Sequence, residues 1–458
     1  MKIGILTYGC SVNRSDSELM ATLLARAGFE PELESEKPKL LIVNTCIVKG
    51  PTENKILRKL KDLQEAGKKV IITGCMPEAY PHLAARFPDF AVLGIDSFDI
   101  VAVVRDYLGQ TVVSRKEAMD GKVLPKTIKY NQFIEIVPIS EGCLGSCTYC
   151  ATKFARGSLV SYNPEALLDG IRQAVGEGVK EVWLTSQDNG CYGFDIGTNL
   201  AELLRAVVEI PGDFKVRVGM MNPQHIGGFL DELIDAYKSD KVFKFLHIPI
   251  QSGSDKVLEE MGRGYTAEDF LRIVSKFREA MELTVSTDII VGFPTETEKD
   301  FQKTIQLLKR AQPDFLNLSK YWPRKKTKAG EMKQLPREVV AARSREVAKL
   351  FSEMLKEKNK SWIGKTCSVT FTDKKGDYLV GRNSLYRPVL VKANSGGLRQ
   401  QSAIFDRTFS KSSVGRNSLY RPVLVEGENL LGKIYSVKII KTKKSELLGE
   451  LYETSQIG

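Results

Sequence analysis

Histidine is scarce in this sequence, with three residues among 458, namely His82, His225 and His247. No Ser/His/Asp arrangement of the kind that activates a hydrolytic nucleophile is visible. No apolar run approaches the roughly 20 residues that a membrane-spanning helix needs. The first residues lack the basic flank, long apolar core and small-residue cleavage site of a secretory signal. We therefore expect a cytoplasmic protein that has no membrane partner.

The charge is unevenly distributed. With 42% hydrophobic and 27% charged residues, the composition is that of folded globular domains, which excludes a disordered or fibrous chain. Residues 1–320 carry a net charge of −4 and residues 321–458 carry +15, which together give the formal +11. This asymmetry predicts a basic surface, suited to an acidic partner, at the C-terminal end.

The first 108 residues alternate apolar strands with amphipathic helices, which is typical of an open α/β domain with parallel strands. Residues 109–131 have little periodicity and are predicted to be a linker. The expected strands are 2–8, 40–45 and 69–74, and the expected helices are 15–27, 53–66 and 77–87.

The same alternation resumes on a larger scale over residues 132–336. Six strands separated by helices predict a partial TIM-like (β/α)6 barrel. The expected strands are 133–139, 181–187, 215–221, 243–250, 284–293 and 315–322, and the expected helices are 164–176, 198–209, 229–238, 266–281 and 297–311.

The last part of the chain reads as one charged connecting helix, 337–360, followed by a small all-β barrel over 361–458. Within it the string VGRNSLYRPVLV occurs at 380–391 and again, identically, at 414–425. Solenoid repeats diverge and usually number at least three, so this match indicates a local duplication or an anomaly. Two identical strands compete for one place, and we expect one copy to be displaced, poorly ordered or swapped.

Three cysteines, Cys143, Cys147 and Cys150, follow the first barrel strand with the spacing C-x3-C-x2-C. In a reducing compartment such cysteines serve metal binding or catalysis rather than disulfides. Three thiolates on one loop can hold three irons of a [4Fe-4S] cluster and leave the fourth iron open to another ligand. A zinc knuckle is the alternative, but it normally requires a fourth Cys or His nearby.

This cysteine loop resembles that of the radical S-adenosylmethionine (SAM) superfamily. The resemblance implies that SAM chelates the open iron and that its reductive cleavage yields a 5′-deoxyadenosyl radical, which an enclosing barrel protects from side reactions. It also implies that Tyr149 packs on the cofactor side. Arg156 and Arg217 are candidates for binding the SAM carboxylate or a phosphate, although a solvated salt bridge is an equal alternative for each.

Further polar segments stand at the ends of barrel strands, where barrel active sites are built. The segment TSQDNG (185–190) resembles the superfamily segment that binds the SAM amino group, and HIPIQSGS (247–254) and DIIVGFPTET (288–297) follow later strands. Each segment taken singly is equally consistent with a strand-end turn. The candidate SAM-binding residues are Ser186, Gln187, Asp188, Gln251, Ser252 and Gly292.

A second set of cysteines, Cys10, Cys46 and Cys75, is spread over the first domain. Each one closely follows a predicted parallel strand, in TYGC, VNTC and ITGC. Because the carboxyl ends of parallel strands lie along one edge of the sheet, the three thiols are expected to converge and bind a second cluster. The alternative for each is a small buried core side chain.

The two cysteine sets together resemble the methylthiotransferases over nearly the whole chain, and NTCIVKGPTEN and GCLGSCTYCATKFARG are most similar to the archaeal and eukaryotic branch. That resemblance implies a C-terminal TRAM-like RNA-binding domain and two [4Fe-4S] clusters, with one open iron of the second cluster carrying a sulfur that a first SAM methylates. It further implies methylthiolation at C2 of N6-threonylcarbamoyladenosine in the anticodon stem-loop of tRNA. An external electron donor and sulfur source are also implied. Asn13, Asn44 and Thr45 flank the sulfur site, as hydrogen-bond donors or as helix caps.

RNA binding would account for the basic C-terminal end, because Lys and Arg neutralise phosphates and exposed aromatics stack on bases. Lysine-rich surfaces that only maintain solubility are the alternative. Relatives show an Arg-Pro-Gly-Thr string where this chain has Arg324-Lys325-Lys326-Thr327. The RNA-contact candidates are Tyr321, Trp322, Arg382, Tyr386, Arg387, Lys433 and Lys438.

Other functions remain open at this point. A methylthiotransferase acting on isopentenyladenosine tRNA or on an aspartate of a ribosomal protein would share the same motifs. An RNA-binding iron-sulfur protein with a role in sensing or electron transfer is the alternative from another class. The two remaining cysteines, Cys191 and Cys367, are expected to be core side chains.

Overall fold

The computed structural model describes residues 1–458 except 49, 111–124, 376–377, 393–430, 444–445 and 452–458. Its first domain is a five-stranded parallel sheet in the order β2-β1-β3-β4-β5, which confirms the predicted open α/β architecture. The strands are β1 (Lys2–Thr7), β2 (Glu30–Leu33), β3 (Leu40–Thr45), β4 (Lys69–Gly74) and β5 (Ala91–Val92).

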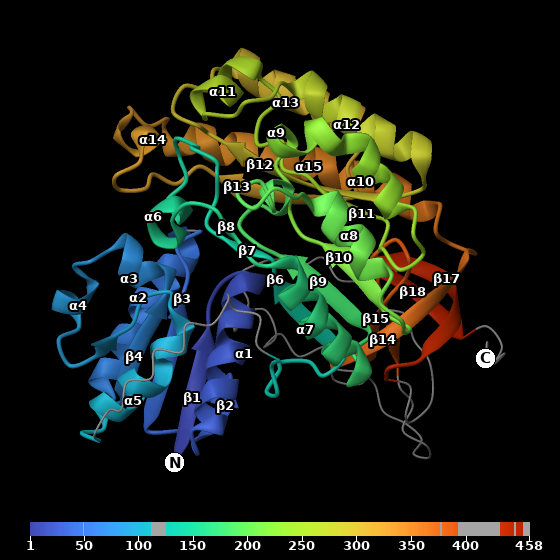
Figure 1. The fold of residues 1–458 in the computed structure, drawn as a ribbon. Coiled ribbons are helices and arrows are strands. Elements are labelled where there is room, and N and C mark those ends of the chain that lie inside the picture. Colours follow the sequence, from blue (N-terminus) through green and yellow to red (C-terminus); the bar gives the residue numbers. More distant parts are fainter. Residues whose placement is uncertain (49, 111–124, 376–377, 393–430, 444–445, 452–458) are drawn as a thin grey trace, which may run out of the picture.

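Helices connect these parallel strands except between β2 and β3, where a loop does so (Figure 1). The predicted single helix over 77–87 is wrong, because two short helices, α3 and α4, stand in its place. Tyr80 precedes Pro81, and the residue before a proline is disfavoured in helical geometry; its φ of −129° and ψ of 77° end the helix there. The helices are α1 (Ser11–Arg26), α2 (Gly50–Glu65), α3 (Cys75–Ala79), α4 (Leu83–Arg86), η1 (Ser97–Asp99) and α5 (Ile100–Tyr107).

The middle of the chain forms the predicted incomplete barrel. Two three-stranded parallel sheets, β10-β9-β6 and β11-β12-β13, are joined by a bridge between Val216 and Val242. A short hairpin, β7 with β8, supports the loop after β6. The strands are β6 (Ile134–Pro138), β7 (Ser140–Glu141), β8 (Val160–Ser161), β9 (Glu181–Thr185), β10 (Lys215–Val218), β11 (Phe245–His247), β12 (Thr284–Val291) and β13 (Phe315–Lys320).

Helices cover the outside of the barrel, and one apolar core fills the space between them and the strands. Several begin at side-chain caps, as Asn163 does for α7 and Thr297 for α13. The helices are α6 (Thr152–Arg156), α7 (Pro164–Gly176), η2 (Asn189–Cys191), α8 (Leu200–Val208), α9 (Pro223–Ile226), η3 (Gly227–Phe229), α10 (Leu230–Tyr237), α11 (Asp255–Glu260), α12 (Ala267–Ala280), α13 (Glu298–Ala311) and α14 (Lys328–Glu331).

The long helix α15 (Arg337–Lys360) then leads to a closed barrel of five strands, in the order β14-β15-β16-β18-β17. The first copy of the repeat, 380–391, forms most of β15 and β16 and the turn between them. The second copy, 414–425, lies outside the described residues. The strands are β14 (Thr366–Lys375), β15 (Tyr378–Arg382), β16 (Pro388–Lys392), β17 (Ile434–Lys443) and β18 (Glu446–Leu451).

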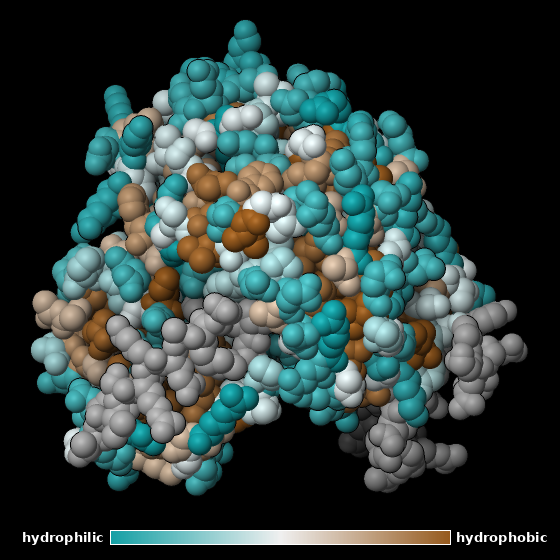
Figure 2. Space-filling model, viewed as in Figure 1, coloured by the Kyte–Doolittle hydropathy of each residue, from teal (hydrophilic) through white to brown (hydrophobic). Residues whose placement is uncertain are grey.

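The small β-barrel packs against the amino ends of the larger barrel's strands. The first domain packs against the opposite side of the larger barrel (Figure 1). Tyr386, in the turn after β15, enters an aromatic cluster with Trp183, Phe243 and Phe245 of the large barrel. Figure 2 shows hydrophilic side chains over the outer helices and more hydrophobic ones toward the middle of this face. Among the described residues, none of the helices has the length and apolar character needed to cross a bilayer.

Candidate functional site

Cys10, Cys46 and Cys75 lie at the carboxyl edge of the five-stranded sheet, as predicted. Cys10 is the N-cap of α1, Cys46 follows β3 directly, and Cys75 is the first residue of α3. A Cβ added to Gly9 would lie 3.0 Å from the Cβ of Cys46, so the loop that carries Cys10 runs against Cys46. Cys46 and Cys75 also share one buried apolar cluster.

The polar residues beside this set hold the strand ends together. Asn13 Nδ2 donates to Asn44 Oδ1 (2.9 Å) and to the Thr45 carbonyl (2.8 Å), and Asn44 Nδ2 returns a bond to the Asn13 carbonyl (2.9 Å). The Cys10 thiol lies 3.4 Å from Asn13 Oδ1. Thr45 Oγ1 accepts from the Met76 amide at 3.1 Å, which fixes the start of α3. These residues therefore orient the loops that carry the cysteines.

Cys143, Cys147 and Cys150 lie on the loop between β7 and α6. A Cβ built on Gly145 would be 3.3 Å from Cys143 Sγ and 3.6 Å from Cys147 Sγ, so both sulfurs flank this glycine. The Gly145 amide also donates to Cys143 Sγ at 3.2 Å. The loop is held from the far side by Thr148, whose amide and hydroxyl donate to the Met261 and Glu260 carbonyls at 3.0 and 2.7 Å.

One arginine joins the two cysteine sites. Arg156, six residues after Cys150, donates from Nε to Cys75 Sγ at 3.3 Å. Its other nitrogens bond Glu141 Oε1 (2.6 Å) and Asp16 Oδ2 (2.8 Å), and its side chain is 1% exposed. Arg156 thus connects α6, the β7 strand and the first domain. Neither alternative of the sequence analysis is confirmed, because this arginine is neither solvated nor at the proposed SAM segment.

Burial dominates the electrostatics of the thiols. It raises the pKa of the Cys143 thiol to about 11 and also raises the pKa of the Cys147 and Cys75 thiols. The guanidinium of Arg263 opposes the shift at Cys147, and that of Arg156 opposes it at Cys75. Metal ligation requires thiolates, so iron binding at these positions must release protons into solution.

Two polar atoms without partners lie in the segment that follows β9. Among the described residues, Ser186 Oγ and Gln187 Oε1 are buried and make no hydrogen bond. Buried polar groups normally have partners, so two orphaned atoms in adjacent residues fit a site that is completed by a polar ligand. This donor set agrees with an iron-sulfur cluster that carries SAM, where the cysteines would hold iron and these atoms would contact the amino acid part of SAM.

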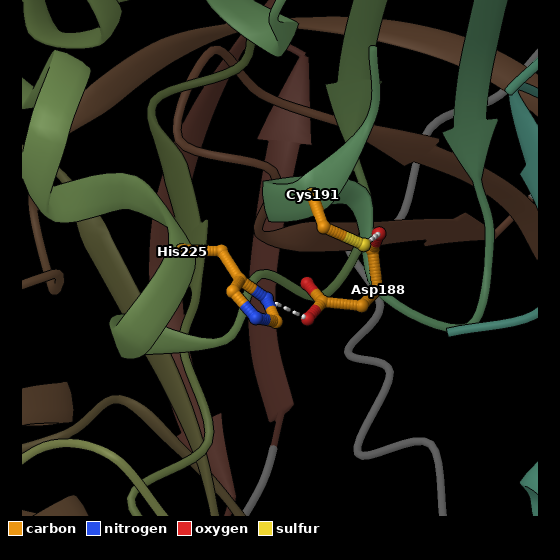
Figure 3. A group of neighbouring side chains, drawn as sticks. All are labelled: Asp188, Cys191 and His225. Atoms are coloured by element: carbon orange, nitrogen blue, oxygen red, sulfur yellow. Dashed lines mark hydrogen bonds and ion pairs between the residues drawn. The ribbon is translucent and has the colours of Figure 1, made fainter. Parts of the chain in front are cut away.

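Asp188 is placed differently from its neighbours. It is buried, and its carboxylate accepts from the amides of Gly190 (2.9 Å) and Asn222 (3.0 Å) and from His225 Nδ1 (2.7 Å). Figure 3 shows the imidazole facing this carboxylate, with the Cys191 thiol beside the Asp188 main chain. The ligand atoms of Asp188, Cys191 and His225 lie within 4.8 Å of one another. Both carboxylate oxygens are already bonded, so we interpret the group as a hydrogen-bonded support beneath the cysteine loop. Cys191 is fully buried.

The remaining SAM candidates have local roles. The place where a Gly292 Cβ would lie is filled by Val340 of α15, 2.6 Å away, so this glycine (φ +79°) permits helix packing. Ser252 is fully buried and accepts from the Ser254 amide at 3.3 Å. Gln251 takes a φ of +71° and bridges to β12 through its backbone. The Tyr149 hydroxyl accepts from Arg263 at 2.7 Å.

Three of the expected RNA contacts are wrong. Arg382 donates to both carboxylate oxygens of Glu181 at 2.9 Å, and Arg387 is paired with Asp314. Both arginines are 6% exposed, and Tyr386 is buried among the aromatic rings of the large barrel. These residues attach the small β-barrel to the large one and are not available to phosphates or bases. Cys367 is partly buried and packs against the small barrel's core.

Of the other RNA-contact candidates, two lysines and one tryptophan lie at the surface. Lys433 and Lys438 are exposed, and the Trp322 side chain is 47% exposed. One face of the Trp322 indole covers Gly50, where a Cβ would overlap the ring. Tyr321 packs edge-on against Phe293, with ring centroids 5.6 Å apart.

The substituted string near residue 324 keeps its turn. Thr327 Oγ1 donates to the Arg324 carbonyl at 2.8 Å, and Arg324 forms a buried ion pair with Glu53 of α2. Lys326 adopts a φ of +66°, in the left-handed region that favours the glycine expected at this position. Arg324 therefore fastens the barrel to the first domain, a role that sequence reasoning missed because its partner is remote in the chain.

Comparison with known proteins identifies two family models in this chain. Residues 137–308 match the Radical SAM superfamily, and residues 2–94 match a family described as Uncharacterized protein family UPF0004. The first contains Cys143, Cys147 and Cys150, and the second contains Cys10, Cys46 and Cys75.

Similar proteins carry one consistent name. A probable threonylcarbamoyladenosine tRNA methylthiotransferase of Pyrococcus horikoshii is 44% identical over 409 residues, which are 87% of this chain and 96% of that relative. The human threonylcarbamoyladenosine tRNA methylthiotransferase is 39% identical over 86% of this chain and 70% of its own length. Among solved structures, the radical SAM methyltransferase TsrM of Kitasatospora setae is similar in fold, with a TM-score of 0.53 at 14% identity over 72% of this chain and 75% of that one.

Proposed function

This chain belongs to the family of threonylcarbamoyladenosine tRNA methylthiotransferases, and on that premise we propose that it converts N6-threonylcarbamoyladenosine in tRNA to the 2-methylthio derivative. It is a radical SAM enzyme whose cofactors are two [4Fe-4S] clusters and SAM. Hydrogen at C2 of adenine is not acidic enough for a side-chain base, which is why this reaction requires radical chemistry.

The observation that carries the proposal is the contact between the segments that carry the two cysteine sets. Arg156 extends from the helix after Cys150 to the sulfur of Cys75, so these two segments meet at one seam between the first domain and the barrel. A reaction that makes a radical at one site and transfers sulfur from another requires them to share one substrate. A protein that used its clusters only for electron transfer would not need the second site to face a barrel mouth.

In this proposal the two cysteine sets and the SAM-binding residues have separate roles. Cys143, Cys147 and Cys150 would hold one cluster, Cys10, Cys46 and Cys75 would hold the other, and Ser186 and Gln187 would orient SAM. When bound, these groups supply the radical that removes hydrogen from C2 and the sulfur and methyl group that replace it. The chain's own polar residues hold these loops in place: Asn13 and Asn44 on one side, and Thr148 and Asp188 on the other.

In this proposal the enzyme binds the anticodon stem-loop of tRNA, because the modified base lies next to the anticodon. The exposed lysines 433 and 438 support phosphate binding, and the half-exposed Trp322 supports base stacking beside the seam. An external electron donor and a sulfur source complete the reaction. The cysteine usage supports a cytoplasmic location.

The test compares three RNA substrates. Anaerobically reconstituted protein receives SAM, dithionite and tRNA that carries threonylcarbamoyladenosine, isopentenyladenosine or unmodified adenosine at the same position. Nucleoside mass spectrometry is expected to find a methylthio group on the threonylcarbamoyl nucleoside alone. A product only on the isopentenyl nucleoside would assign the chain to the other tRNA substrate. SAM cleavage without any RNA product would overturn the proposal.

Cysteine variants serve as matched controls. The triple change of Cys10, Cys46 and Cys75 to Ala should halve the iron content, from about eight to about four per chain, and retain SAM cleavage. The triple change of Cys143, Cys147 and Cys150 to Ala should abolish SAM cleavage. Loss of SAM cleavage in both variants would contradict this division of roles.

A further inference from the structure

Arg217 is a cation inside the large barrel. On β10 it is paired in register with Trp183 of β9, and its guanidinium lies 5.7 Å from the Trp183 ring centroid and 5.6 Å from that of Phe245 on β11. The Tyr386 ring of the small β-barrel lies 5.5 Å away on the amino-terminal side. Because Trp183 and Phe245 share the interior cluster with residues of β6 and β13, Arg217 points into the same interior.

This guanidinium has no anionic partner among the described residues. It makes no hydrogen bond or ion pair there, and its Nε is buried without an acceptor. Two carboxylates on other strands of the same barrel are bound to other partners: Glu181 to Arg382, and Asp288 to His247 at 2.7 Å. Desolvating a charge without a partner is costly, and the three aromatic rings offset only part of that cost. The residue as a whole is partly exposed, so it is not sealed off from solvent.

A carboxylate is the ligand that this arrangement suits. A guanidinium presents parallel donors that match the two oxygens of a carboxylate, and aromatic walls hold its plane in place. Arg217 is level with Trp183 on the neighbouring strand. Trp183 lies three residues before Ser186, which corresponds to about 10 Å along an extended strand. A group that reaches Arg217 therefore extends well below the cysteine loop and the residues beside it.

We propose that Arg217 binds the carboxylate of the threonyl group on the substrate nucleoside, and that it thereby selects threonylcarbamoyladenosine over isopentenyladenosine. This inference rests on the proposed function. The threonylcarbamoyl group extends from N6 through several covalent bonds to a free carboxylate, so it can descend into the barrel while C2 stays near the cysteine loop. An isopentenyl group is a hydrocarbon and would leave the guanidinium desolvated and unpaired, which disfavours it strongly. SAM is the second possible source of a carboxylate.

The test uses anticodon stem-loop RNA that carries threonylcarbamoyladenosine, either as the free acid or as its methyl ester. The reconstituted wild-type enzyme is expected to prefer the acid by about tenfold to hundredfold in kcat/KM, the size of a charged hydrogen-bonded contact. Arg217→Gln should bring this ratio close to one. The matched control is Lys215→Gln, a cation two residues earlier on the same strand, which should keep the wild-type ratio. Iron content and SAM cleavage without RNA report the fold and the SAM site of each variant.

Each outcome separates the possibilities. A wild-type enzyme that modifies both RNAs equally would overturn the inference and leave the proposed function intact, and this comparison needs no variant to fold. An unchanged preference in Arg217→Gln would overturn the role of this arginine. Loss of RNA-independent SAM cleavage in a variant with normal iron content would assign Arg217 to the SAM carboxylate. Modification of isopentenyl RNA alone by the wild type would overturn both proposals.

Discussion

Arg156 has more structural partners than its place in the sequence suggests. Its guanidinium bonds a cysteine sulfur and two carboxylates that belong to three separate segments, and it is almost completely buried. Removing one member of a buried charged group leaves the others without partners, which costs more than the group's net contribution to stability. The residue therefore affects both the stability of the seam and the geometry of the Cys75 site.

The first prediction concerns Arg156→Ala. Because the buried Asp16 and the partly buried Glu141 would lose this cation, we expect the apoprotein to lose about 3–5 kcal/mol of stability, measured by urea unfolding. Arg172→Ala is the matched control, since Arg172 pairs with Asp169 at the surface and should cost less than about 1 kcal/mol. Equal effects of the two changes would show that the Arg156 network contributes no more than a surface pair.

The second prediction concerns Lys326, whose φ of +66° is unfavourable for a side chain with a Cβ. Lys326→Gly should raise the free energy of unfolding by about 0.5–1 kcal/mol, because glycine adopts this conformation without strain. The neighbouring exposed Lys325 has no positive φ, so Lys325→Gly should destabilise by a similar amount through the entropy of the unfolded chain. Thermal melts of both variants check the sign, and destabilisation by Lys326→Gly would refute the strain argument.

At the scale of the element, the N-terminus of α13 shows how a helix start is fixed. Thr297 caps the helix, and Asp300 at its third position bonds back to the cap and accepts from Ser254 Oγ at 2.7 Å. Burial raises the pKa of Asp300, but the hydrogen bonds from Thr297 and Ser254 outweigh it and lower the pKa to about 2. The folded helix therefore stabilises the charged form of the Asp300 carboxyl group.

The third prediction follows from that carboxylate. Because the pKa of Asp300 is lower in the folded state than its unfolded value of 3.8, the charged carboxylate stabilises the protein at pH values above 3.8. This contribution disappears as the pH falls through about 2. Asp300→Asn should cost about 2 kcal/mol at neutral pH, and the difference from wild type should shrink as the pH falls from about 4 toward 2. Urea unfolding of the apoproteins at several pH values measures it, with the exposed Asp62→Asn as control. A difference independent of pH would contradict the argument.

At the scale of the whole molecule, the basic C-terminal end serves two purposes. Arg382 and Arg387 face inward and attach the small β-barrel to the amino ends of the large barrel's strands. Lys433 and Lys438 face outward. The excess positive charge of this region therefore overstates the charge that is available to RNA.

The fourth prediction separates these two groups by the salt dependence of tRNA binding. Each phosphate contact removed should reduce the slope of log K against log salt by about 0.7–0.9, so Lys433→Gln should flatten it. Arg382→Gln should leave the slope unchanged and instead loosen the small β-barrel, which limited proteolysis would detect. A flatter slope in Arg382→Gln with an unchanged proteolysis pattern would return this arginine to the RNA-binding surface.

The sequence by itself determined the features that are set by local spacing. The three cysteines of one loop, the three cysteines that follow strands, and the alternation of strands and helices are all visible because their patterns repeat over a few residues. The places of Cys10, Cys46 and Cys75 followed from a general property of parallel sheets.

Only the tertiary structure decided which charged residues face inward. Arg156 meets Cys75, Arg382 meets Glu181, and Arg217 has no anionic partner among the described residues. An arginine has the same local signature at a surface and at a buried interface, because its environment depends on segments far away in the chain. Burial and charge pairing are therefore properties of the folded arrangement, and for this protein they distinguish residues that hold the domains together from residues that can bind a substrate.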